Sequence, residues 1–369
     1  MKTSILRPAL VLSVAGLLGV LLVGCDKKEA QRDSDDESAA DGGKGKAKPS
    51  KAATDEPDLA QAMENVAADR APGAAMGAAP GGPPPSGIFG PGEADKAALK
   101  GGAATFALGG EGTEPRVLLG PGPKPGSKRS GTVDLATQSD PQQGAIPIQF
   151  TVTVEAQKPK VEGDAGAPLT TVVTKVTSAK INAPGVPADL SAAVGKLKGS
   201  SVQYQVGADG VAVNVRSEIP KSVDPGFRDP VQALADLLVG LALPYPTKPV
   251  GVGAFWMVTT RDVVMGLDVV SYRLVKVEKV EGSVVSLSLN TKRYAASPTF
   301  DLEGLPPDAP KTMGEFRAQS EGKLTVTPGD PFPKSSEVQS LIAAALGAAD
   351  AKQRPMVQVQ TRASLTLAP

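Results

Sequence analysis

The side chains that most often carry enzyme chemistry are scarce in this sequence. Histidine is absent from the 369 residues, and the one cysteine, Cys25, lies near the N-terminus. Without imidazole or a second thiol, the chain builds neither a Ser-His-Asp triad nor a zinc site of His and Cys ligands. This composition excludes many hydrolases and most transition-metal enzymes, and we expect no metal site and no cofactor.

Two further groupings have the residue types for catalysis. Ser320 and Lys323 have the spacing of Ser-Lys acyl transferases, which place both side chains on one helical turn, but the following residues 324–327 are typical of a strand. Carboxylates for a glycosidase pair stand beside Pro or Gly, which indicates solvated turn residues. These carboxylates are Asp224, Asp229, Asp262, Asp268, Asp301 and Asp308. An enzyme would need a pocket with converging carboxylates or a buried lysine, and we expect no catalysis.

The sequence around Cys25 points to lipid attachment. Two basic residues precede an uncharged, mostly apolar run over 9–23. This run is shorter than the about 20 residues of a transmembrane helix and fits a secretory signal. It ends in Leu22-Val23-Gly24-Cys25, which resembles the lipobox of bacterial lipoproteins. The resemblance implies cleavage after Gly24 and acylation of Cys25, palmitate included. The alternatives are an uncleaved anchor and an ordinary signal peptide.

Such processing would place the protein in the cell envelope, held to a membrane by its N-terminal lipid and facing the periplasm. Asp26 resembles the inner-membrane retention signal of enteric bacteria, but the choice between inner and outer membrane stays open. Lys plus Arg number 39, as do Asp plus Glu. This balance gives no bias towards nucleic acid, which we do not expect as a partner.

Composition divides the chain into three parts. Residues 1–24 form the predicted signal peptide. Residues 25–100 hold five Val, Ile, Leu or Phe side chains, too few to offset the entropy of ordering, so we expect a disordered tether rich in Ala, Gly and Pro. Residues 101–369 are predicted to form a single β-rich domain.

Alternating apolar and polar residues predict about eight strands in this domain. They cover 146–154, 169–181, 202–206, 211–215, 255–264, 267–280, 283–294, 323–327 and 357–367. Three helices are also predicted. Asp229-Pro230 is a strong start signal for the apolar helix 231–243, Asp189 caps 190–197, and a capping box at Ser336 favours a helix to 346.

These elements predict an α+β, mostly β fold. We expect a curved antiparallel sheet or half-barrel packed on the apolar helix 231–243, because a sheet with one dry face must cover it. The alternative is a β-sandwich.

A further resemblance covers residues 145–367. Leu197-Lys198-Gly199, Val202-Gln203-Tyr204-Gln205-Val206, and Pro249-Val250-Gly251-Val252-Gly253 before Phe255-Trp256 are similar to segments of uncharacterised β-rich domains in bacterial envelope lipoproteins. The resemblance implies fold and location, and brings no activity or site residues.

Two non-catalytic functions compete. In the first, the domain binds an apolar ligand such as lipid, and the helix acts as plug or lid. The candidate lining residues are Phe150, Leu237, Leu241, Trp256 and Tyr272. In the second, the domain is a structural or interaction module that meets an envelope protein through a sheet edge or face. The first predicts an internal void and the second a filled core.

Overall fold

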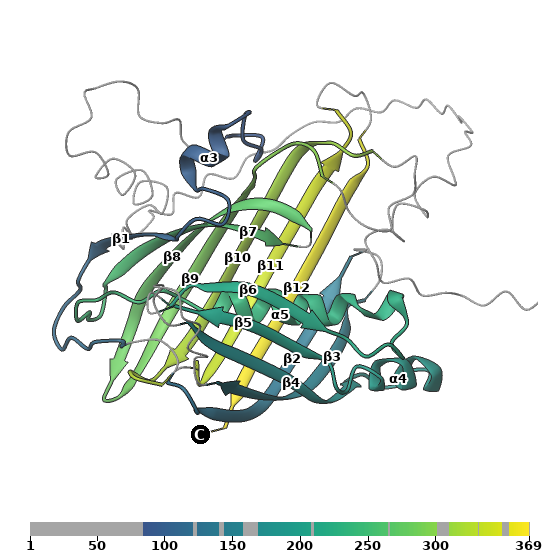
Figure 1. Ribbon diagram of the computed structural model, residues 1–369, viewed down its shortest axis with the longest axis horizontal. Helices are drawn as coiled ribbons and strands as arrows, with labels where there is room; N and C mark the ends of the chain where they lie inside the picture. The colour runs from purple at the N-terminus through teal and green to yellow at the C-terminus, as the bar shows by residue number, and fades with distance from the viewer. Residues whose placement is uncertain are drawn as a thin grey trace, which may run out of the picture. The chain divides into compact units, whose positions relative to one another are not determined.

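The computed structural model describes residues 84–120, 124–139, 144–157, 169–207, 210–264, 266–300, 310–330, 332–348 and 354–368. The predicted signal peptide, Cys25 and most of the predicted tether lie outside these ranges. Within them, twelve strands form one antiparallel sheet that is not closed, in the order β1-β7-β8-β9-β10-β11-β12-β2-β3-β4-β5-β6 (Figure 1).

The strands are β1 (Thr105–Gly110), β2 (Lys128–Gln138), β3 (Ile146–Ala156), β4 (Thr170–Ile181), β5 (Ser201–Val206), β6 (Ala212–Glu218), β7 (Phe255–Val264), β8 (Leu267–Glu281), β9 (Val284–Ala295), β10 (Met313–Val326), β11 (Ser335–Leu346) and β12 (Met356–Leu367). The helices are α3 (Glu93–Ala97), α4 (Ala188–Gly195) and α5 (Asp229–Leu241), with a 3-10 turn at Pro225–Phe227.

The two faces of the sheet differ because side chains alternate along each strand. On β9, Val285, Leu287 and Leu289 are buried on the face that we call the inner face. This face packs against α5, whose Val231 and Leu234 are fully buried. The same apolar cluster contains residues of β3, β4 and β5 and of β7, β8 and β9. One helix therefore packs against both halves of the sheet, and Figure 1 shows β5 and β6 passing in front of α5 with β10–β12 behind it.

The predicted mostly β class is confirmed, and helices form close to 190–197 and 231–243. In the described ranges the hydrogen bonds connect one sheet, whereas a β-sandwich would have two. The strands outnumber the predicted ones: β1 and β2 have no counterpart in the prediction, and β10 extends well beyond 323–327.

The predicted helix from Ser336 to residue 346 is wrong, because this segment is strand β11. Its small and apolar residues fit both periods: Val338, Ile342 and Leu346 match a helical face, but also recur at even positions of a strand. Pairing with β10 on one side and β12 on the other satisfies the backbone groups along the segment. Tertiary pairing thus overrides the local helix signal.

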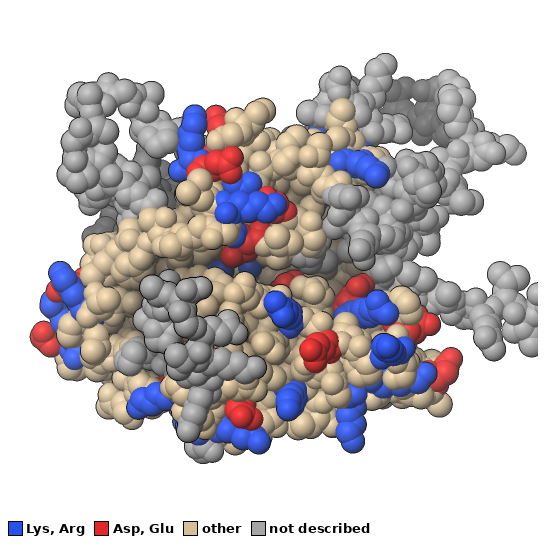
Figure 2. Space-filling model, viewed as in Figure 1, with Lys and Arg blue, Asp and Glu red and all other residues tan. Residues whose placement is uncertain are grey.

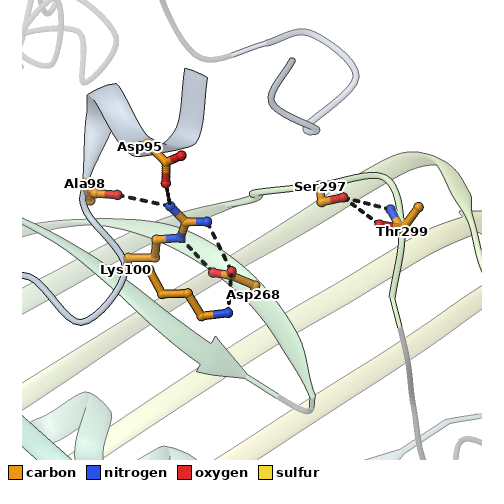
Figure 3. Close-up of polar contacts among 7 residues, drawn as sticks. Asp95, Ala98, Lys100, Asp268, Ser297 and Thr299 are labelled. Atoms are coloured by element: carbon orange, nitrogen blue, oxygen red, sulfur yellow. Dashed lines mark hydrogen bonds and ion pairs between the residues drawn. The ribbon is translucent and has the colours of Figure 1, made fainter. Parts of the chain in front are cut away.

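The folded part begins before residue 101, which corrects the predicted tether boundary. Phe89 and Ala94 are buried against Val270 on the outer face of the sheet. The Arg261 side chain of β7 also holds this segment (Figure 3). Its guanidinium contacts Asp95 of α3, donates to the Ala98 carbonyl at 3.4 Å, and forms a 2.9 Å bond from Nε to Asp268. Lys100 lies 3.3 Å from the same Asp268 carboxylate.

Gly87 offers a test of this packing. Its φ is +75°, and a Cβ at this position would lie 1.7 Å from the Phe316 carbonyl oxygen. Gly92 has a similar φ of +72°, but an added Cβ meets nothing within 4 Å. We expect Gly92→Ala to lower the free energy of unfolding by about 1 kcal/mol through backbone strain alone. Gly87→Ala should cost at least ~2 kcal/mol more in urea unfolding, because strand β10 must shift. Equal losses would contradict the packing of Ser86–Ala98 on the sheet.

Candidate ligand cavity

A cavity of about 430 Å³ lies between α5 and the inner face of the sheet, within the about 300–1,000 Å³ typical of small-molecule sites. The deeper wall is apolar and includes Leu135, Ile148, Leu237, Leu241, Leu289 and Val338. Figure 2 shows the surface hollowed between the part formed by β7 and the part formed by β5 and β6, with basic and acidic atoms along the hollow.

The cavity exists because α5 fills only part of the inner face. One side of the helix packs into the core through Val231 and Leu234. The other side faces the cavity through Ala233, Leu237 and Gly240. Two of these three residues have a small side chain or none, so the space between helix and sheet stays open. The helix is therefore both the cover of the core and one wall of the cavity.

A row of polar side chains crosses the inner face at mid-height of the strands. Strand register places Arg273 of β8 opposite Thr291 of β9, then Ser320, Ser340, Thr361 and Thr137 on the next strands in order. All six line the cavity. The neighbouring row on the deep side is Leu289, Gly322, Val338, Ala363 and Leu135. The cavity thus joins an apolar floor to a belt of hydroxyls, which suits a molecule with an apolar and a polar part.

Four charged groups stand around this belt. From the sheet, Arg273 donates from Nη2 to Asp262 at 3.1 Å, and Arg293 of β9 lines the cavity one position further along. From α5, Asp229 and Asp236 face the same space. Burial raises the pKa of Asp236 to about 6, although a hydrogen bond from Gln232 and the charge of Arg293 oppose this. Burial also raises the pKa of Asp229 to about 6.

The structure separates the five candidate lining residues. Leu237 and Leu241 lie in the cavity wall. Phe150 and Trp256 are fully buried in the core next to it, and the Trp256 indole donates to the Pro244 carbonyl at 3.0 Å. Tyr272 lies on the outer face, because alternation along β8 turns it away from Ser271 and Arg273, and its ring packs edge-on to that of Tyr294. Tyr272, Phe150 and Trp256 are therefore not proposed as lining residues.

Sequence reasoning missed the charged and hydroxyl groups of the cavity. The available signal was the alternation along β9. Its odd-numbered residues Leu287, Leu289 and Thr291 face inward, and Arg293 is the next residue in this series, so a cation lies where the pattern predicts a buried side chain. Asp262, interpreted as a solvated turn residue, lies within β7 and accepts a 2.6 Å hydrogen bond from Thr260.

The other chemical candidates do not assemble. Ser320 is buried on the inner face of β10, whereas Lys323 is exposed on the opposite face, so the pair does not meet. Across the described ranges, no group of three or more acidic, His or Cys residues has the arrangement of a metal site. In the same ranges, no helix has both the length and the apolar character to cross a membrane.

Comparisons with known proteins give little further information. No family model matches the chain, and no curated protein matches it. One solved structure with some likeness, described as lipid-protein interactions in lipovitellin, has 11% sequence identity and a TM-score of 0.40. The match covers 67% of this chain and 25% of that one, so the chain spans about a quarter of the length of that protein. A likeness at this level carries no functional information.

Asp236 makes the stability of the folded protein depend on pH. Because burial raises its pKa from 3.8 to about 6, the folded state binds more protons than the unfolded state between these values, and stability falls as pH rises. Asp236→Asn removes this loss. We expect the variant to gain stability relative to the unchanged protein as the pH rises. The difference between their free energies of unfolding, variant minus unchanged protein, should be about 1–3 kcal/mol higher at pH 7 than at pH 4. Urea unfolding at both pH values measures this. The control is Asp189→Asn, at an exposed residue of α4. If the stability difference between Asp236→Asn and the unchanged protein does not change with pH, the raised pKa of Asp236 is contradicted.

Proposed function

We propose that this chain is a lipid-anchored lipoprotein of the bacterial envelope whose β-rich domain holds the apolar part of a lipid between α5 and the inner face of the sheet. The observation that carries the proposal is the cavity of about 430 Å³ with an apolar floor. Apolar side chains around an empty cavity lack the packing contacts and the burial that stabilise a core. A bound acyl chain would supply both.

The ligand-binding function also accounts for the composition of α5. Leu237 and Leu241 belong to the buried core cluster, and both also line the cavity. A bound chain would cover them and would lie against Leu289 and Val338 on the opposite wall.

The interaction-module hypothesis is supported by a different observation. Strand β6 is an edge of the sheet, and its Val213 and Val215 are exposed. An edge with exposed valines suits pairing with a partner strand. That hypothesis also predicts a filled core, however, and the cavity favours ligand binding as the main function. We further propose that the bound molecule is held or carried without being chemically changed.

Gly240 gives a direct test of the cavity. An added Cβ there meets nothing within 4 Å, and the residue lines the cavity. Gly240→Phe should fill the space while leaving the fold intact, because replacing a helical Gly favours the helix by up to about 1 kcal/mol. We expect the full chain purified from its own envelope to yield an extractable acyl lipid, and Gly240→Phe to lose at least ~90% of it. Organic extraction with mass spectrometry gives the ratio of lipid to protein.

The matched control is Gly195→Phe at the end of α4, where an added Cβ also meets nothing within 4 Å but the residue does not line the cavity. This variant should retain the lipid. The proposal fails if the unchanged protein carries no lipid, or if both phenylalanine variants retain it equally.

The anchor is tested separately. Cys25→Ser removes the proposed acylation site, so we expect the variant to lose the mass of its acyl groups and to move from the membrane to the soluble fraction after cell fractionation. Intact-protein mass spectrometry and fractionation measure the two effects. An unchanged mass and an unchanged membrane fraction would show that Cys25 is not the anchor.

A further inference from the structure

Three buried polar groups without a partner lie on adjacent positions of β8 and β9, two of them on residues that line the cavity. They are Nε of Arg293, Nε of Arg273 and Oγ of Ser271, which make no hydrogen bond within the described part of the chain. Ser271 and Arg293 stand opposite each other in the β8–β9 register, and Arg273 is the next inward residue on β8. Buried donors almost always have a partner in folded proteins. Three orphaned groups side by side therefore indicate a partner that comes from outside the chain.

The nearby carboxylates do not supply that partner. Asp262 is engaged by Thr260 at 2.6 Å and by the far end of Arg273 at 3.1 Å. Asp236 and Asp229 face the cavity from α5, yet neither forms an ion pair with Arg293 among the described residues. Burial and the charge of Arg273 lower the pKa of Arg293, whereas the charges of Asp236 and Asp262 oppose this. Arg293 is thus a half-buried cation in the cavity wall with a buried Nε, and among the described residues no protein anion is bonded to it.

The surroundings of Arg293 fit an acidic head group and little else. A second guanidinium lies next to it, and the belt of hydroxyls begins beside it at Thr291 and Ser320. Guanidinium and hydroxyl groups donate hydrogen bonds to carboxylate and phosphate oxygens, and such charge-assisted bonds are the strong ones. A neutral head group would leave the charge of Arg293 unpaired.

We infer that the ligand is an acidic amphiphile, with its carboxylate or phosphate on Arg293 and Arg273 and its acyl chain between α5 and the apolar floor. The inference rests on the proposed function, since it specifies which lipid class the cavity takes. It also assigns different roles to the two walls: the helix and the deep rows bind the chain, and β8 and β9 select the head group.

Displacement of a neutral fluorescent probe, N-phenyl-1-naphthylamine, tests the inference with the full chain carrying Cys25→Ser, which has no acyl group of its own. The competitors are palmitate, dioleoyl phosphatidate, hexadecanol and hexadecylamine. We expect an acidic competitor to displace the probe at a concentration at least tenfold lower than hexadecanol or hexadecylamine. Palmitate against phosphatidate distinguishes a free fatty acid from a phospholipid as the source of the head group.

Arg293→Gln should raise by about 10- to 100-fold the concentration of the preferred acid that displaces the probe. This is the effect of losing a hydrogen bond to a charged group. Displacement by hexadecanol should change less than threefold. Lys292→Gln is the matched control, since Lys292 is the adjacent cation on the opposite face of β9, and it should alter neither value.

The outcomes separate the inference from the proposed function. If hexadecanol competes as well as the acids, the inference of an acidic head group is overturned while lipid binding stands. The same holds if Arg293→Gln leaves unchanged the ratio of the displacing concentrations of hexadecanol and the acids. If the probe does not bind, or if Gly240→Phe binds it as well as the unchanged cavity does, the proposed function itself fails, and the inference with it.

Discussion

One helix has to cover the inner face of a large sheet, and the rest of the structure depends on this mismatch. The 13 residues of α5 span about 20 Å at the usual rise. The 15 residues of β8 and the 14 of β10 span about 45–50 Å. The sheet curves round the helix, and the core closes where Val231 and Leu234 meet it. Where the other side of the helix does not reach the sheet, the space between them stays open, and there the cavity lies.

The residues in this open part differ from those of the closed core. The inner face of β9 changes from Val285, Leu287 and Leu289 to Thr291 and Arg293 as it leaves the core for the cavity. A sequence selected only for stability would avoid an arginine whose Nε is buried without a partner, because it costs more than an apolar residue of similar size. Local rules are most often broken at functional sites. The position of Arg293 therefore supports the idea that the cavity is kept for a ligand.

Much of the fold follows from the sequence, since strands with clear alternation, such as β3, β7 and β12, agree with their predicted ranges within two residues. The apolar run that starts at Asp229-Pro230 likewise gives α5. The prediction failed where two periods coexist, as in the Ala-rich β11, because only pairing with β10 and β12 decides between them. It also failed for Ile88 and Phe89, because two apolar residues in a Gly/Pro-rich stretch give no periodic signal.

The candidate site was less predictable than the fold. The place of Leu237 and Leu241 in the cavity wall follows from an unusually apolar helix. The polar belt does not, because it arises from the register of six strands, the consecutive β8 to β12 and the distant β2. Tyr272 shows the same limit, since its face depends on the parity of β8 relative to the core. Residue type alone favoured the aromatic side chain, whereas register places Arg273 of β8 in the cavity wall.

The most direct test of the account is the location of a bound chain in a crystal structure. Crystals of the protein with 16-bromopalmitate would give an anomalous signal at the bromine on the last carbon of the chain. The account predicts this peak between Leu237 or Leu241 of α5 and Leu289 or Val338 of the sheet. A bromine found only on the molecular surface, or a cavity closed by a shift of α5 onto the sheet, would contradict it.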